Sequence, residues 1–196
     1  MPTSTPPVHQ HAEERTSILY SALLGASWAT LAAPVRWAHS VGEEKTGRFR
    51  IVHGSRWLTR LALLGSRLPK AALAAETNLT IIADESGEKW DRKFNGEEFT
   101  TLQWNSGGSL TERFGPWELR FALRVGGGAL FYEQCGARYC LGRWRMPMPR
   151  VFAPFVEAKE WADGPEQVRV MVKVTLPIVG LLIAYDGTLD MKSHSS

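Results

Sequence analysis

The sequence predicts a mainly β (α+β) fold, an antiparallel up-and-down meander of about eight to nine strands curled into a barrel or half-barrel, with two N-terminal amphipathic helices covering it. Three observations predict this fold. From Asn78 onward, the period of the apolar residues changes from about 3.6 to about 2. Short glycine-containing turns separate the alternating segments. No helical pattern interrupts them, which excludes parallel βαβ units.

Two helices are expected before the sheet. The first runs from about Thr16 to Leu31, because its apolar residues follow one helical face and Pro34 comes after its end. A short alternating strand at residues 47–54 leads to the second helix, Ser55 to Leu68, whose arginines lie off its apolar stripe. Such a basic amphipathic helix could rest on an anionic membrane, but packing on the domain is the favoured interpretation.

The strands follow in order, each bounded by a turn signal. Asn95-Gly96 is a strong hairpin turn, and Gly126-Gly127-Gly128 is a turn rather than a phosphate-binding loop because it joins two strands. A Pro-rich segment, Gly142 to Phe155, interrupts the sheet. The predicted strands are Leu79–Ala83, Glu88–Phe94, Glu97–Trp104, Leu110–Phe114, Trp117–Val125, Ala129–Leu141, Val156–Trp161, Gln167–Leu176 and Gly180–Tyr185.

Length and composition indicate one ligand-binding β domain over residues 15–190, with flexible tails at residues 1–14 and 191–196. Apolar residues make up 44% of the chain, enough for a core, and the net charge of +3 does not favour nucleic acid as a partner. No apolar run approaches the ~18 residues of a membrane span. The N-terminus lacks an apolar signal core, so a cytoplasmic location is expected.

Several segments of the chain form recognisable motifs: Leu19-Tyr20 to Leu24-Gly25, Gly47-Arg48-Phe49, Leu110 to Pro116, the segment from Pro147 through Pro149-Arg150 and Ala153-Pro154 to Ala158, and Leu176 to Leu182 with Tyr185-Asp186-Gly187. Together they resemble the bacterial domain-of-unknown-function family 4166. The resemblance covers about residues 17–190 and implies no particular reaction or catalytic residues. Relatives are sometimes fused to dehydrogenase-like or epimerase-like domains, which implies a role in small-molecule metabolism.

Polar residues that share a predicted strand face with apolar neighbours are the candidate site. Buried charges are costly, so these residues either pair with one another, face a hydrated cavity or belong to a solvated face. A carboxylate in an apolar cavity could act as a general acid or base. The expected catalytic residues are Glu133, then Glu112, with Arg92 as their charge partner; the expected ligand contacts on the strands are Trp90, Gln103, Phe131 and Tyr139.

The Pro-rich segment adds three candidates. Arg143, Trp144 and Arg150 could form a mouth that grips a partly apolar ligand with a polar or anionic end. The alternative is a rigid connection whose aromatic residues complete the core. Of the histidines, only His39 and His53 are plausible working imidazoles, and a structural role is favoured for both.

No nucleotide, metal or nucleophile motif is present, so no cofactor is expected. The favoured function is binding of a hydrophobic small molecule in the barrel with cofactor-independent conversion, as in a cyclase, isomerase or lyase of natural-product biosynthesis. A non-catalytic carrier of a lipid-like ligand and a protein- or membrane-interaction module are the alternatives. The first two predict a pocket of several hundred Å3, and the third a filled interior.

Overall fold

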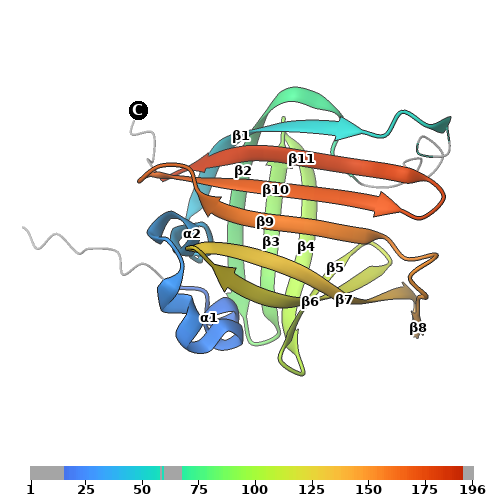
Figure 1. Cartoon of the computed structure of the whole chain (residues 1–196), viewed down its shortest axis with the longest axis horizontal. Helices are drawn as coiled ribbons and strands as arrows, with labels where there is room; N and C mark the ends of the chain where they lie inside the picture. The colour runs from blue at the N-terminus through green and yellow to red at the C-terminus, as the bar shows by residue number, and fades with distance from the viewer. Residues whose placement is uncertain (1–15, 58, 60–67, 192–196) are drawn as a thin grey trace, which may run out of the picture.

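The computed structural model describes residues 16–57, 59 and 68–191, and shows a closed antiparallel barrel (Figure 1). The strand order is β6-β5-β4-β3-β2-β1-β11-β10-β9-β7-β8, and pairing of β6 with β7 closes a ring of ten strands, with β8 added beside β7. The helices are α1 (Ile18–Leu24), the 3-10 helix η1 (Gly25–Thr30) and α2 (Ala33–Ala38); the strands are β1 (Glu44–His53), β2 (Ala72–Asp84), β3 (Gly87–Phe94), β4 (Glu97–Ser106), β5 (Ser109–Phe114), β6 (Trp117–Gly126), β7 (Ala129–Leu141), β8 (Trp144–Pro147), β9 (Phe155–Ala162), β10 (Gln167–Leu176) and β11 (Gly180–Asp190).

The antiparallel meander and its closure confirm the predicted barrel, with a slightly higher strand count. The strand β8 lies within the segment that was expected to interrupt the sheet. β2 begins at Ala72 because Ala72–Ala75 continues the pairing with β1. These alanine and leucine residues do not alternate with polar ones, so the two-residue period can be recognised in the sequence only from about Asn78 onward.

The prediction of two amphipathic helices that cover the barrel is wrong in detail. The segment expected as one helix divides at Gly25, which adopts a positive φ of 52°, and continues as the 3-10 helix η1. Pro34 lies in the first turn of α2, where its fixed φ and missing N–H suit a helix start, rather than after a helix end. The second expected helix, Ser55 to Leu68, falls largely outside the described residues.

The short helices close one end of the barrel, here called the helical end (Figure 1). α1 contacts β4 and β6, while α2 contacts β9 and β10. Ser17 caps α1 by accepting a hydrogen bond from the Tyr20 amide at 3.0 Å, and its hydroxyl donates to the Glu88 carboxylate on β3. Tyr20 is fully buried, so α1 is attached to the barrel by both its cap and its first turn. Within the described residues, no helix is long and apolar enough to cross a membrane.

Lys45 anchors the loop that joins α2 to β1. Its side chain is fully buried, and its Nζ donates to the carbonyl oxygens of Ser40 at 2.7 Å and Glu43 at 3.4 Å. Burial lowers the pKa of Lys45 to about 8, against the opposing effect of the carboxylates of Glu43 and Glu88. The ammonium is therefore a buried charge held mainly by backbone oxygens.

The depressed pKa of Lys45 predicts a specific pH dependence of stability. Between pH 8 and 10.5 the unfolded chain binds more protons at this lysine than the folded chain, so its contribution to the free energy of unfolding rises with pH. The slope from one proton is at most about 1.4 kcal/mol per pH unit. Urea unfolding across this window should show wild type gaining stability relative to Lys45→Met. A difference between the two proteins that is independent of pH would contradict the assignment.

Candidate functional site

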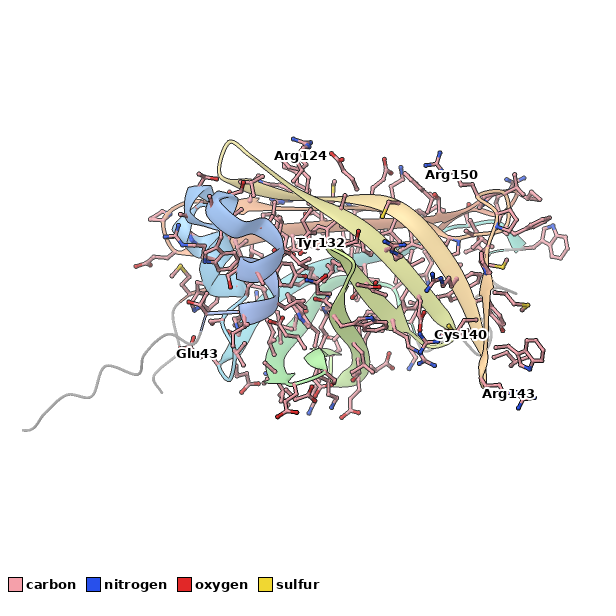
Figure 2. The ribbon with its side chains drawn as sticks, turned by 90° about the horizontal axis from the view of Figure 1, so that it is seen from below. Glu43, Arg124, Tyr132, Cys140, Arg143 and Arg150 are labelled. Carbon is pink, nitrogen blue, oxygen red and sulfur yellow. The ribbon has the colours of Figure 1, made fainter. Side chains whose placement is uncertain are left out.

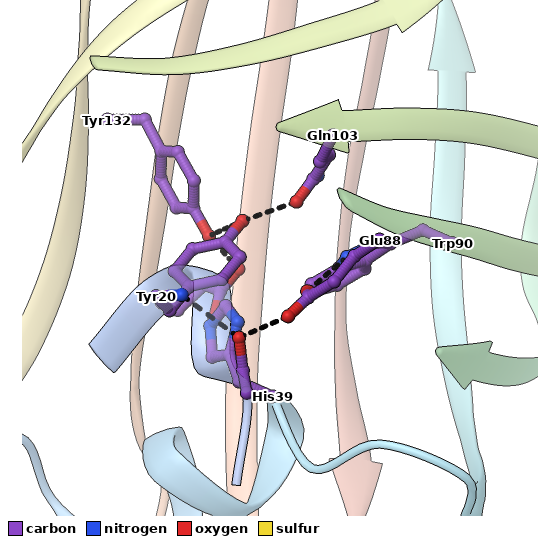
Figure 3. Close-up of polar contacts among 8 residues, drawn as sticks. Tyr20, His39, Glu88, Trp90, Gln103 and Tyr132 are labelled. Carbon is purple, nitrogen blue, oxygen red and sulfur yellow. Dashed lines mark hydrogen bonds and ion pairs between the residues drawn. The ribbon is translucent and has the colours of Figure 1, made fainter. Parts of the chain in front are cut away.

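A chain of buried polar side chains crosses the helical end of the barrel (Figure 3). His39 Nε2 lies 2.8 Å from Glu160 Oε2, and the Tyr132 hydroxyl donates to Glu160 Oε1 at 2.8 Å. The hydroxyl oxygens of Tyr132 and Tyr20 are 3.3 Å apart. Tyr20 in turn donates to Gln103 Oε1 at 2.8 Å. This series of hydrogen-bonded side chains therefore connects the two helices to three strands on different sides of the barrel.

Gln103 extends this chain toward the interior. It lies opposite Glu112 in the pairing of β4 with β5, so both side chains point to the same face. Its Nε2 donates to Glu112 Oε1 at 3.2 Å. The guanidinium of Arg92 approaches the same carboxylate oxygen at 3.9 Å and donates to Thr101 Oγ1 at 2.9 Å. Arg92 also lies over the Trp90 ring, 4.9 Å from its centroid.

The electrostatics keep Glu160 charged and the tyrosines protonated. Burial raises the pKa of Glu160, but the imidazole of His39, the Tyr132 hydroxyl and the charge of Arg92 outweigh it, so the pKa lies below its ordinary value. Burial, reinforced by Glu160, raises the pKa of Tyr20 and of Tyr132 well above the ordinary range. Burial also raises the pKa of Tyr185 to about 12.

A cavity of about 80 Å3 lies inside the barrel next to this chain. A second cavity of about 50 Å3 shares the wall formed by Glu112 and Tyr185 and extends to Leu68 and Pro69. The first cavity is lined by Ala38, Phe49, Thr77, Leu79, Trp90, Arg92, Phe94, Gln103, Glu112, Phe121, Tyr132, Val156, Ala158, Glu160, Val170, Val172, Tyr185 and Leu189.

The interior is much smaller than the several hundred Å3 that the sequence led us to expect. Large side chains fill the barrel: Phe121 is 1% exposed, and Phe94 packs against Phe49 and Tyr185 with ring centroids 5.9 Å from each. A ten-stranded barrel has room for a ligand, but aromatic residues on its inner face occupy most of that room. The remaining space fits a slender molecule or a single small group.

Four of the expected site residues meet in this interior. Arg92, Glu112, Trp90 and Gln103 all line the first cavity. Period-2 alternation on β3, β4 and β5 therefore identified which residues face inward. Their catalytic and binding roles remain predictions.

Glu133 does not face the cavity, and the expectation that it does is wrong. Its carboxylate is on the outer surface, 56% exposed, and pairs with Arg124 at 2.6 Å. β7 carries adjacent aromatic residues, Phe131 and Tyr132, and the pattern selected the wrong one as inward. Tyr132 lines the cavity, whereas Phe131 lies outside between the cations of Arg124 and Lys159.

The other expected ligand contacts also lie away from the cavity. Tyr139 packs edge-on against Trp117 with ring centroids 5.1 Å apart. Arg143, Trp144 and Arg150 are exposed on β8 and the loops beside it. Figure 2 shows Arg143 and Arg150 at the end opposite the helices. Trp144 is 64% exposed, so the alternative that this segment completes the core is wrong for its tryptophan.

Sequence reasoning missed Glu160 and Tyr132, and assigned His39 a structural role. The alternation that identified Glu112 also applies to Val156, Ala158 and Glu160, and it marks Glu160 as an inward charge. His53 does have a structural contact, since its Nε2 lies 2.8 Å from the Pro69 carbonyl oxygen. Among the described residues, no group of three or more His, Cys, Asp or Glu side chains is placed to hold a metal ion.

Comparison with known proteins identifies a family and a distant likeness to solved structures. The family model with the description Domain of unknown function (DUF4166) matches residues 31–189. The chain is similar to a crystal structure of a protein with unknown function, from the DUF3598 family of Nostoc punctiforme, with 13% identity and a TM-score of 0.46. The match covers 75% of this chain and 46% of the other, so this chain spans about half the length of that relative. The sequence matches no curated protein.

Proposed function

We propose that this chain, which belongs to the family described as domain of unknown function DUF4166, binds a slender, mainly apolar small molecule in its barrel. The polar group of that molecule would accept hydrogen bonds from Arg92, beside Glu112. One observation carries the proposal. The Arg92 guanidinium and the Glu112 carboxylate face a cavity whose other walls are mostly apolar, and they stand 3.9 Å apart instead of forming a close pair. A ligand oxygen could take hydrogen bonds from Arg92 at that point.

The shape of the interior sets the class of ligand. The two adjoining cavities favour a thin molecule that extends from Arg92 toward Leu68 over a bulky or polycyclic one. Arg92 favours a carboxylate, or a carbonyl that develops negative charge, as the polar group. The aromatic and aliphatic walls exclude a ligand that is charged along its length.

Hexanoate and 1-hexanol are suitable probes for this proposal, because they share a chain and differ in the polar group. Titration calorimetry should show hexanoate binding wild type more tightly than hexanol. Arg92→Met should weaken hexanoate binding at least tenfold and leave hexanol binding nearly unchanged, since a charge-assisted hydrogen bond is worth about 1.5–3 kcal/mol. Lys93→Met is the matched control, because Lys93 is the next residue on β3 and faces outward. No binding of either probe, or an equal response of both probes to Arg92→Met, would refute the assignment.

The same pair supports conversion of the ligand as a second function. Glu112 can move a proton on a bound molecule whose developing negative charge Arg92 stabilises, as in a cofactor-independent isomerisation, cyclisation or elimination. Native mass spectrometry of wild type and Glu112→Gln distinguishes this function from carriage. An enzyme retains different molecules in the two proteins, substrate in Glu112→Gln and product in wild type. A carrier retains the same molecule in both.

A further inference from the structure

The end of the barrel opposite the helices carries an exposed apolar segment, residues 141–155, here called the arginine arm. All four residues of β8 are exposed, so both faces of this strand meet solvent. Figure 2 shows Arg143 and Arg150 at this end, away from the helices. The exposed large apolar side chains of the arm are Leu141 (63%), Trp144 (64%), Met146 (46%), Val151 (58%), Phe152 (60%) and Phe155 (48%). A patch of this kind in a folded chain indicates a binding surface.

The arm is basic as well as apolar. Between Glu133 and Glu157 the chain holds four arginines and no acidic residue. Within the described part of the chain, Arg143 and Arg150 form no ion pair, and the guanidinium of Arg143 lies 5.9 Å from the Trp144 ring centroid. Arg145 is the exception, since its Nη1 is 3.8 Å from the buried Glu118 carboxylate. The free charges therefore favour an anionic partner.

Neighbouring turns extend this surface across the same end. The turn from β10 to β11 exposes Ile178 (77%), and the segment that follows β1 exposes Trp57 (68%). Arg56 donates to the Ile178 carbonyl oxygen at 3.3 Å, which joins these two segments. Figure 1 places both segments at the end where β8 lies. Aromatic and basic residues thus recur on several separate connections of one end.

Several acidic side chains lie at the helical end. The β2–β3 turn carries Asp84 and Glu85, the loop before β1 carries Glu43, and the β9–β10 turn carries Asp163. Figure 2 shows Glu43 beside the helices, across the molecule from Arg143. An anionic plane would attract the free arginines of the arm and repel these acidic side chains, which favours an approach with the arm first.

We propose that the arginine arm docks the molecule end-on onto an anionic phospholipid bilayer. Tryptophan and phenylalanine beside arginine are the residues that enter the headgroup region of such a surface. An edge strand such as β8, exposed on both faces, is suited to insertion into a fluid layer, whereas a flat protein partner would bury only one face. The proposal rests on the outer surface and is independent of what the cavity binds.

Sedimentation of the full chain with vesicles tests the docking. We expect binding to vesicles of phosphatidylcholine and phosphatidylglycerol in equal parts, little binding to phosphatidylcholine alone, and release by high salt. Arg143→Gln with Arg150→Gln should weaken partition about 25-fold, since each charge near an anionic surface contributes roughly a factor of five. Trp144→Ser with Phe152→Ser should also weaken it, because the apolar anchors are lost. These four residues are exposed, so circular dichroism and thermal unfolding should show folded variants.

Matched variants at other places on the surface complete the test. Arg48→Gln with Arg50→Gln removes two exposed arginines from β1, and Ile18→Ser with Ile82→Ser removes two exposed apolar residues near the helical end. Both variants should bind vesicles as wild type does. Equal binding to neutral vesicles, or an equal loss in the control variants, would overturn the proposal. So would absent vesicle binding together with a dimer that Trp144→Ser with Phe152→Ser dissociates, because a second copy would then cover the arm.

Discussion

Replacing Glu160 with alanine is expected to lower the free energy of unfolding by about 3–5 kcal/mol, the usual cost of removing one partner from a buried ion pair. The carboxylate accepts from Tyr132 and pairs with His39, whose side chain is fully buried. His39 Nδ1 already has no hydrogen-bond partner within the described residues, so the change would leave the imidazole entirely unsatisfied. Urea unfolding followed by circular dichroism measures the effect.

Two further variants test whether the loss of stability in Glu160→Ala comes from the buried pair. Glu157→Ala removes an exposed carboxylate from the same strand, paired with Lys173 at 2.8 Å, and should cost no more than about 1 kcal/mol. His39→Phe with Glu160→Leu replaces the buried pair by apolar groups and should be more stable than Glu160→Ala alone. If Glu160→Ala were as mild as Glu157→Ala, the polar chain would not be what attaches α2 to the barrel.

The second large effect is expected at Gly47, where β1 and β11 approach too closely for a side chain. A Cβ at this position would lie 1.9 Å from the backbone oxygen of Thr188 and 3.0 Å from the Cα of Leu189. Gly187 on the other strand is crowded in the same way, with the Arg48 oxygen 2.2 Å from its Cβ position. Gly47→Ala must therefore separate the two strands, at a cost of about 3 kcal/mol or more.

Gly136→Ala is the control for this prediction. Gly136 is also a strand glycine outside the left-handed region, but the nearest atoms to its Cβ position lie 3.8 Å away on the Arg120 side chain. We expect this change to be neutral or to stabilise by up to about 1 kcal/mol, because alanine restricts the unfolded chain. Thermal unfolding of both variants gives the comparison. Similar losses in the two would show that strand glycines are needed for a reason other than close approach.

Those parts of the fold could be predicted whose sequence patterns depend only on neighbouring residues. Alternation on β3 to β6 and turns such as Asn95-Gly96 depend on adjacent residues, and they correctly predicted an antiparallel meander. The break in the first helix was not predicted, because Gly25 and Pro34 each have several compatible positions in a helical pattern. Which position applies depends on how α1 and α2 pack on the strands.

The candidate site shows the same division. Glu112 and Arg92 were identified because each strand that carries them has a single apolar face. Glu133 was misplaced because β7 has aromatic residues on both faces, and its outer one is stabilised by cations from β6 and β9. The residues next to Phe131 in the sequence give no indication that Arg124 and Lys159 lie over its ring.

By itself the sequence determined the antiparallel class, the family and the inward orientation of Arg92, Glu112, Trp90 and Gln103, since strand alternation and motif order are properties of neighbouring residues. Only the tertiary structure decided that β6 pairs with β7 to close the ring, that His39 meets Glu160 across 121 positions of sequence, and that little open volume remains. The physical reason is that closure, long-range pairing and cavity size depend on which side chains from distant strands compete for the same interior space.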